Sequence, residues 1–126
     1  MIWEVQWDEV CKFINTKGDK VNLDDSTTYG NYNNSTGKAN ITGAGSLQNT
    51  GFSENWKTNN IYDLAGNCME WTQEVYYLYH RKNRGGSFYE SVNDYNVCVY
   101  KYINIGPSAY NDYTATRPTM YIKTTN

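Results

Sequence analysis

The residues of this sequence best placed to do chemistry are two carboxylates set around a glycine–asparagine turn. Residues 60–72 read NIYDLAGNCMEWT, so Asp63 and Glu70 stand on either side of Gly66 and Asn67. Such a turn brings backbone carbonyls next to side-chain oxygens, and a hard cation such as Ca²⁺ takes about six to eight oxygen ligands. The pattern therefore allows a calcium site. It equally allows a metal-free turn in which Asp63 caps the backbone and Glu70 bonds to backbone groups.

The thiols and the imidazole form no catalytic group. Cys11, Cys68 and Cys98 are too widely spaced for a zinc motif or a disulfide framework, although a single disulfide stays open. His80 is the only histidine, so any Ser–His–Asp or Cys–His mechanism must use it. It stands in the polar stretch YLYHRKNR, which is typical of a hairpin end. We interpret the cysteines as separate thiols and predict no catalytic residue.

Composition narrows the class of protein. The chain has 126 residues, a net charge of -2 and 13 Tyr, but only 21 Leu, Ile, Val and Phe together. Low net charge and many rings argue against disorder, so we expect one domain with an aromatic-rich core. No apolar run is long enough for a membrane span. No basic stripe supports nucleic-acid binding. The N-terminus has the composition of neither a signal nor a transit peptide, and we expect the chain to be the C-terminal part of a longer protein.

A helix and several short strands must position these groups. The spacing of Trp3, Trp7, Val10, Cys11 and Ile14 predicts a helix with this face inward, and Glu4 falls on another side. Residues 18–60 show no lasting period and predict ordered loops. Strands are predicted at residues 68–72, 75–79, 84–89, 97–105 and 120–123.

The expected fold class is α+β, with one or two helices, a small twisted antiparallel sheet and extensive loops. The rings expected in the core are those of Trp3, Trp7, Trp56, Trp71 and Tyr62. Gly85 and Gly86, in the stretch RGGSF, are interpreted as backbone geometry, because two adjacent glycines permit a bulge or a close strand approach.

Three motifs in order, NIYDLAGNCMEWT, RGGSF and TRPTMYI, resemble the family of formylglycine-generating enzymes (sulfatase-modifying factors), whose domain is a variant of the C-type lectin fold. The resemblance is strong over residues 60–123. It is weaker over residues 3–60, where QWD and DSTTYGNYNNST look like non-catalytic bacterial and phage members. It implies an optional structural calcium, held by the side chains of Asp63 and Glu70 and the carbonyls of Gly66 and Cys68. No other cofactor is required. Met69 stands where the family usually has Trp.

The resemblance also bears on catalysis. The family's oxidase chemistry uses two cysteines after the Gly-Gly-Ser motif to bind copper(I), and soft thiolates suit that metal. Those positions fall on Glu90 and Tyr95, and one histidine cannot build the multi-histidine iron site of related branches. We therefore expect a non-catalytic branch. The alternatives are a catalytic oxidase with an unrecognised site and a purely structural module of a phage tail or surface protein.

The segment YESVNDYNVCVYKYINIGPSAYNDY, residues 89–113, is rich in Tyr, Asn and Ser, as antibody paratopes are. We predict that it binds a protein or glycan receptor on a target cell, from a phage tail or a bacterial surface. Tyr100 and Ala115-Thr116 depart from the family pattern, which fits a surface varied by a diversity-generating retroelement. Plain scaffold is the alternative. The predicted contact residues are Tyr89, Glu90, Asn93, Asp94, Tyr95, Tyr100, Tyr102, Tyr110, Asn111 and Tyr113.

Overall fold

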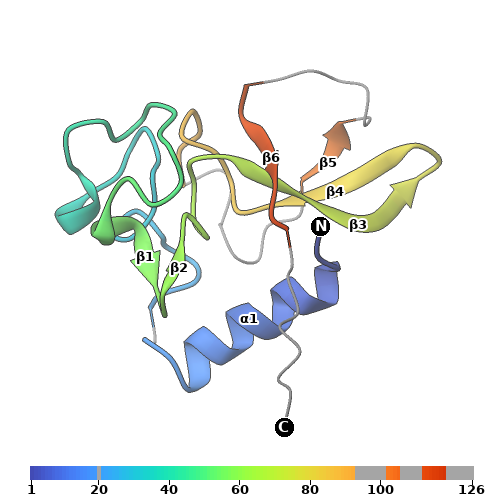
Figure 1. Cartoon of the computed structure of the whole chain (residues 1–126), viewed down its shortest axis with the longest axis horizontal. Helices are drawn as coiled ribbons and strands as arrows, with labels where there is room; N and C mark the ends of the chain where they lie inside the picture. Colours follow the sequence, from blue (N-terminus) through green and yellow to red (C-terminus); the bar gives the residue numbers. More distant parts are fainter. Residues whose placement is uncertain (20, 93–101, 106–111, 119–126) are drawn as a thin grey trace, which may run out of the picture.

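The computed structural model describes residues 1–19, 21–92, 102–105 and 112–118, and for residues 102–105 it describes the backbone alone. Its elements are α1 (Glu4–Thr16), the 3-10 turns η1 (Gly37–Ala39) and η2 (Glu54–Trp56), and the strands β1 (Lys57–Thr58), β2 (Ile61–Tyr62), β3 (Met69–Tyr77), β4 (His80–Arg84), β5 (Tyr102–Ile105) and β6 (Thr114–Thr116). In Figure 1 the helix lies below a twisted sheet. The loops gather on the side where β3 begins, away from the β3–β4 hairpin. The predicted α+β class is confirmed.

The larger sheet has the order β5-β4-β3-β6, and the smaller one pairs β1 with β2. Strand β4 runs antiparallel to both β3 and β5, but β6 runs parallel to β3. The prediction of an antiparallel sheet is therefore wrong at this edge. A parallel pair needs a long connection, and residues 78–113, which include β4 and β5, join the end of β3 to the start of β6.

The strand boundaries differ from those expected. The predicted strands 68–72 and 75–79 form one strand, β3, because register shifts after Trp71 take the place of a turn. The predicted strand 84–89 is wrong, because β4 ends at Arg84 and the backbone of Gly85 and Gly86 turns at φ 93° and 70°. Residues 97–101 and 120–123 lie outside the described residues. β6 was not predicted, since Thr-Ala-Thr is too short to carry a pattern.

The helix prediction holds for three of its five face residues. Trp7, Cys11 and Ile14 are buried and pack with Leu64, and Val10 is partly buried against them. The prediction that Trp3 lies on the inward face is wrong, because this residue is 49% exposed. Its backbone is extended (φ −79°, ψ 152°), so it precedes the helix and does not share its period. Of the other expected core rings, Trp56 is buried and those of Trp71 and Tyr62 are half-buried.

Residues 21–56 form loops, as predicted, held by single buried side chains. Tyr29 and Tyr32 pack with Ala65 and Val92 in a second cluster. The indole N–H of Trp56 donates to the carbonyl of Ala39 at 3.0 Å. Because each ring buries a large area, a few such anchors can fix a long segment with little regular structure.

A buried ionic group fastens α1 to the sheet. The side chain of Arg84, at the end of β4, is 1% exposed and pairs with Glu4 (Nη1 to Oε1, 3.5 Å) and with Asp8. The Nζ of Lys82 donates to the other Glu4 oxygen at 2.8 Å, and the guanidinium of Arg84 lies 5.8 Å from the centre of the Trp7 ring. Glu4 was expected on a solvent side of the helix. It is buried because its partners are on β4, far away in the sequence.

We expect Arg84→Met to lower the free energy of unfolding by about 3–5 kcal/mol, because it leaves the buried Glu4 carboxylate without its nearest buried partner. Urea denaturation would measure the loss. The matched control is Lys12→Met, whose pair with Glu9 has both side chains about two-thirds exposed and should change stability by less than about 0.5 kcal/mol. Equal small losses in both variants would contradict the role of Arg84.

Candidate functional site

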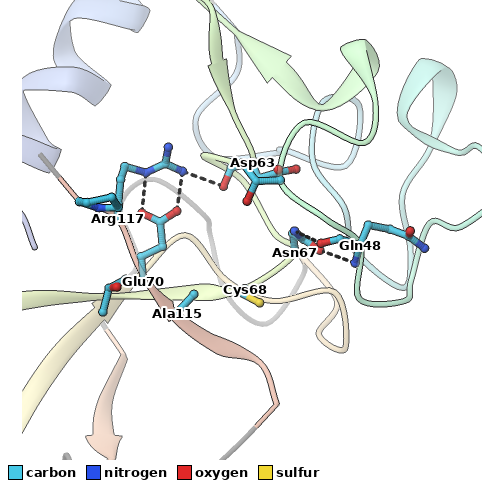
Figure 2. A pocket seen from close by; sticks show the side chains of 10 residues that line it. Gln48, Asp63, Asn67, Cys68, Glu70, Ala115 and Arg117 are labelled. Carbon is cyan, nitrogen blue, oxygen red and sulfur yellow. Dashed lines mark hydrogen bonds and ion pairs between the residues drawn. The ribbon is translucent and has the colours of Figure 1, made fainter. Parts of the chain in front are cut away.

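A pocket of about 170 Å³ opens where the turn before β3 meets β6. Figure 2 shows its side chains, which come from three separate parts of the chain. The lining residues are Gln48, Thr50, Asp63, Asn67, Cys68, Glu70, Ala115, Thr116, Arg117 and Pro118. Three of the four residues predicted to hold calcium, Asp63, Cys68 and Glu70, therefore line the same pocket. The fourth, Gly66, is buried beneath the pocket against Asn31.

Arg117 closes one side of this pocket by engaging Glu70. Its Nε donates to Glu70 Oε2 at 2.7 Å and its Nη2 donates to Oε1 (Figure 2). The same Nη2 donates to the carbonyls of Tyr62 at 3.0 Å and Asp63 at 3.3 Å. Burial raises the pKa of Glu70, and Arg117 opposes that rise. Such a fork-shaped contact with both carboxylate oxygens is the strong form of this ion pair.

Asp63 holds the opposite wall. Its backbone has φ 51°, a conformation that Asp and Asn tolerate better than most residues. Its Oδ2 accepts the N–H of Gly51 at 3.0 Å. Burial raises the pKa of Asp63, while the Gly51 N–H and Arg117 lower it. Asp63 thus caps the backbone, as the metal-free alternative proposed. Glu70, by contrast, bonds to a guanidinium and not to the backbone.

These side chains do not form a calcium cage as they lie. Both oxygens of Glu70 are engaged by Arg117, so a calcium ion would have to compete with a fixed cation for them. In the described parts of the chain, no three His, Cys, Asp or Glu side chains gather as a metal would need. Calcium binding stays a prediction. The sequence does not predict Arg117 as the partner of Glu70. The available signal is that one motif contains an acid, Glu70, and another contains an arginine, Arg117.

The cysteines are placed separately. Cys11 is buried in the helix face, and Cys68 is a half-buried free thiol at the pocket. Burial raises the pKa of the Cys68 thiol, and the carboxylates of Glu70 and Asp63 add to the rise. A thiol with a raised pKa is a poor nucleophile, because the thiolate is the reactive form. Cys98 lies outside the described residues.

Two buried asparagines support the floor of the pocket. Asn67 exchanges hydrogen bonds with the backbone of Gln48, donating to its carbonyl at 2.9 Å and accepting its N–H at 3.0 Å. Asn31 donates to Asn67 Oδ1 at 3.1 Å. Each amide satisfies donors and acceptors of a loop that has no ladder of its own. The loop of residues 31–48 is therefore fixed to the turn that carries Asp63 and Glu70.

A second group of residues lies around the loop that follows β4. Tyr89 is 73% exposed, Glu90 is half-buried, and the half-buried Tyr113 precedes β6. Tyr102 begins β5, where the backbone alone is described. The other predicted contact residues, Asn93, Asp94, Tyr95, Tyr100, Tyr110 and Asn111, lie outside the described residues. The structure thus describes the start of the predicted binding segment.

The backbone around Tyr89 is held on both sides. Asn33 donates through Nδ2 to the Tyr89 carbonyl at 3.0 Å, and its Oδ1 accepts the Ser91 hydroxyl at 2.8 Å. The N–H of the buried Val92 donates to Asn34 Oδ1 at 3.1 Å. The loop of residues 31–34, NYNN, therefore fixes the conformation of residues 89–92 through hydrogen bonds. The Tyr89 side chain projects from a fixed base.

Glu90 helps to close the same loop. Its Oε2 accepts the N–H of Ser87 at 3.1 Å. Burial raises the pKa of Glu90, and the hydrogen bond from the Ser87 N–H lowers it, with a net rise. The Glu90 carboxylate thus helps to shape the turn after Gly86.

No protein-family model, curated protein or solved structure matches the chain. Within the described residues, no helix is both long and apolar enough to cross a membrane.

We expect Gly66→Ala to destabilise the fold by about 3 kcal/mol or more. A Cβ at Gly66 would lie 2.1 Å from the Asn31 carbonyl oxygen, and the backbone φ of 72° is unfavourable as well. Gly37→Ala is the matched control, because φ is 55° there but no atom lies within 4 Å. It should lose only about 1–2 kcal/mol, from the backbone alone. Thermal and urea unfolding would compare them, and equal losses would show that the contact is not close.

The raised pKa of Glu90 predicts a pH dependence of stability. The folded state holds this proton more tightly than the unfolded state, so the contribution is fully present below the ordinary carboxyl pKa of about 4. It is lost as the pH rises through the raised value. Glu90→Gln keeps an acceptor for the Ser87 N–H but removes the titration. Its free energy of unfolding should fall less than that of the wild type between acid and neutral pH, and parallel profiles would contradict this.

Proposed function

We propose that this chain is a non-catalytic ligand-binding domain of the formylglycine-generating enzyme type, with a C-type lectin-like fold. In this proposal the surface that begins at Tyr89 binds a protein or glycan on a target cell. The observation that carries it is the contrast at Tyr89, whose ring is mostly exposed while the backbone beside it is hydrogen-bonded to Asn33. A preordered tyrosine loses little conformational entropy on binding, which favours affinity.

The meeting of the three motifs supports the family proposal. The Gly66 N–H of the first motif donates to the Gly85 carbonyl of the second at 2.7 Å. Arg117 of the third motif pairs with Glu70 of the first. The residues that carry the resemblance lie far apart in the sequence. Their contacts in the structure give a physical reason for the three motifs to occur in one chain. The motif residues here are used for backbone geometry and for one ion pair.

The non-catalytic part of the proposal is supported by the chemistry of the nearby groups. Glu90 stands where the oxidase has a thiolate, and its carboxylate accepts a backbone hydrogen bond. The Cys68 thiol has a raised pKa and lies beside two carboxylates, which disfavour the thiolate. His80 stands at the start of β4, on the hairpin. The imidazole that a Cys–His mechanism would use is therefore not among the side chains that line the Cys68 pocket.

A virion tail or a bacterial surface is the proposed location, and diversification by a retroelement is part of the same proposal. It rests on the Tyr- and Asn-rich composition of residues 89–113. The neighbouring DNA tests the diversification directly. A reverse transcriptase beside a near-copy of the codons for residues 85–117, differing at adenines, is the expected finding.

Binding itself is tested with the purified chain on intact bacterial cells and a printed glycan array. We expect Tyr89→Ala to weaken the binding found there by about tenfold or more, because exposed tyrosines on rigid loops are typical hot spots. Val5→Ser, on the exposed side of α1, should bind as the wild type does. Unchanged binding by Tyr89→Ala would remove Tyr89 from the site, and a wild type that binds neither probe would count against a receptor-binding role.

A further inference from the structure

The far end of the β3–β4 hairpin carries an apolar surface that the proposed binding site does not use. Figure 1 shows this hairpin extending away from the helix and the loops. Five consecutive uncharged side chains at its end are between 53% and 80% exposed. We call them the hairpin tip: Val75, Tyr76, Tyr77, Leu78 and Tyr79. Contiguous exposed apolar runs are unusual on a protein surface and mark interaction sites.

The turn at the tip is made of residues that do not favour it. Tyr77 pairs with His80, so Leu78 and Tyr79 form a two-residue connection. Of these two residues Leu78 has a positive φ and Tyr79 does not, and two-residue connections of that kind prefer Gly at the first position. Leu78 adopts φ 43°, which is unfavourable for a side chain of its size. A strained leucine on the surface indicates that its side chain has a role in a contact with another molecule.

The edge of β3 next to the tip is unpaired in the part of the chain that the structure describes. β6 pairs only with Met69–Trp71 of β3, and the Ile2 carbonyl accepts the Gln73 N–H at 3.1 Å. From Glu74 to Tyr77, no described strand lies on the edge away from β4. An exposed apolar edge strand is a template for pairing with another strand.

We propose that a second copy of this chain covers the hairpin tip, with two hairpins packed edge to edge across a two-fold axis. A two-fold interface uses the same surface on both copies, so an uncharged apolar tip meets its like and buries no lone charge. A buried aromatic side chain contributes about 150–250 Å². Because the five side chains of the tip are between 53% and 80% exposed, covering them fully would bury roughly 600 Å² per copy, near the lower end of standard interfaces.

The other occupants fit less well. The chain has a net charge of -2 and a pI near 5.3, which disfavours an anionic lipid surface. A glycan would need polar partners beside the rings, whereas Val75 and Leu78 offer none. The dimer also adds something to the proposed function. Because β4 runs from the tip toward the Tyr89 loop, a tip-to-tip dimer would carry two such loops and bind a repetitive target with avidity.

Sedimentation velocity on the whole chain, from about 1 µM to 1 mM, tests the proposal. The wild type should shift from monomer to dimer over this range. Leu78→Gly combined with Tyr79→Asn places the glycine that this turn prefers at the position with positive φ, so it should raise the melting temperature while weakening association at least tenfold. A variant that is more stable but associates less cannot owe its loss to misfolding. Val5→Ser, which removes an equally exposed apolar side chain from α1, should dimerise like the wild type.

A second variant keeps the test valid if the turn variant does not fold. Val75→Thr with Tyr77→Thr retains β-forming residues and removes apolar area from the strand, and it should also associate at least tenfold more weakly. A wild type that stays monomeric throughout overturns the proposal. So does dimerisation unchanged in both tip variants. A monomer whose tip instead binds phosphatidylserine vesicles or a printed glycan would assign the surface to that partner and overturn it too.

Discussion

The close approach of Gly66 to the backbone of Asn31 is the constraint on which most of this structure depends. The two residues form an isolated parallel bridge, and the Asn67 N–H donates to the Asn31 carbonyl at 2.9 Å. Only a residue without Cβ can lie there. The contact joins the loops of the first half of the chain to the sheet of the second half. The contact adds a backbone bridge to the side-chain anchors, such as Tyr32 and Trp56, that also hold residues 21–56.

Next to this contact, the consecutive residues Leu64 and Ala65 pack into different apolar clusters. Leu64 packs with Trp7 and Ile14 in the cluster beneath α1, and Ala65 packs with the tyrosines of the loops. A chain with few aliphatic residues builds small clusters, and Val21 packs against both of them. The Asn31–Asn67 amides and the Arg84 ion pairs add buried polar contacts beside these clusters. Buried polar groups satisfied in this way also specify a unique arrangement, since few other arrangements would satisfy them.

The range of each interaction along the chain decides whether the sequence predicts it. The period of α1 identifies Trp7, Cys11 and Ile14, because a helix face is a local property. It misplaces Trp3, where the helix has not begun, and Glu4, whose partner Arg84 lies on β4. Likewise Asp63 and Glu70 are recognisable as a carboxylate pair, but the cation that meets Glu70 is Arg117, from the far end of the chain. The parallel pairing of β6 depends on the same distant segment.

The ion pair of Glu70 with Arg117 also bears on where function can lie. It occupies the carboxylate that a metal or a substrate proton would need, and the same guanidinium holds the carbonyls of Tyr62 and Asp63. The motif region is thus a structural junction in which Glu70, Arg117 and the Asp63 Oδ2 atom are engaged by protein groups. Tyr89 lies outside this junction, because its ring is 73% exposed while its backbone carbonyl is hydrogen-bonded to Asn33. A substitution of this side chain should therefore leave the fold intact, which is the freedom that the proposed binding role of the loop requires.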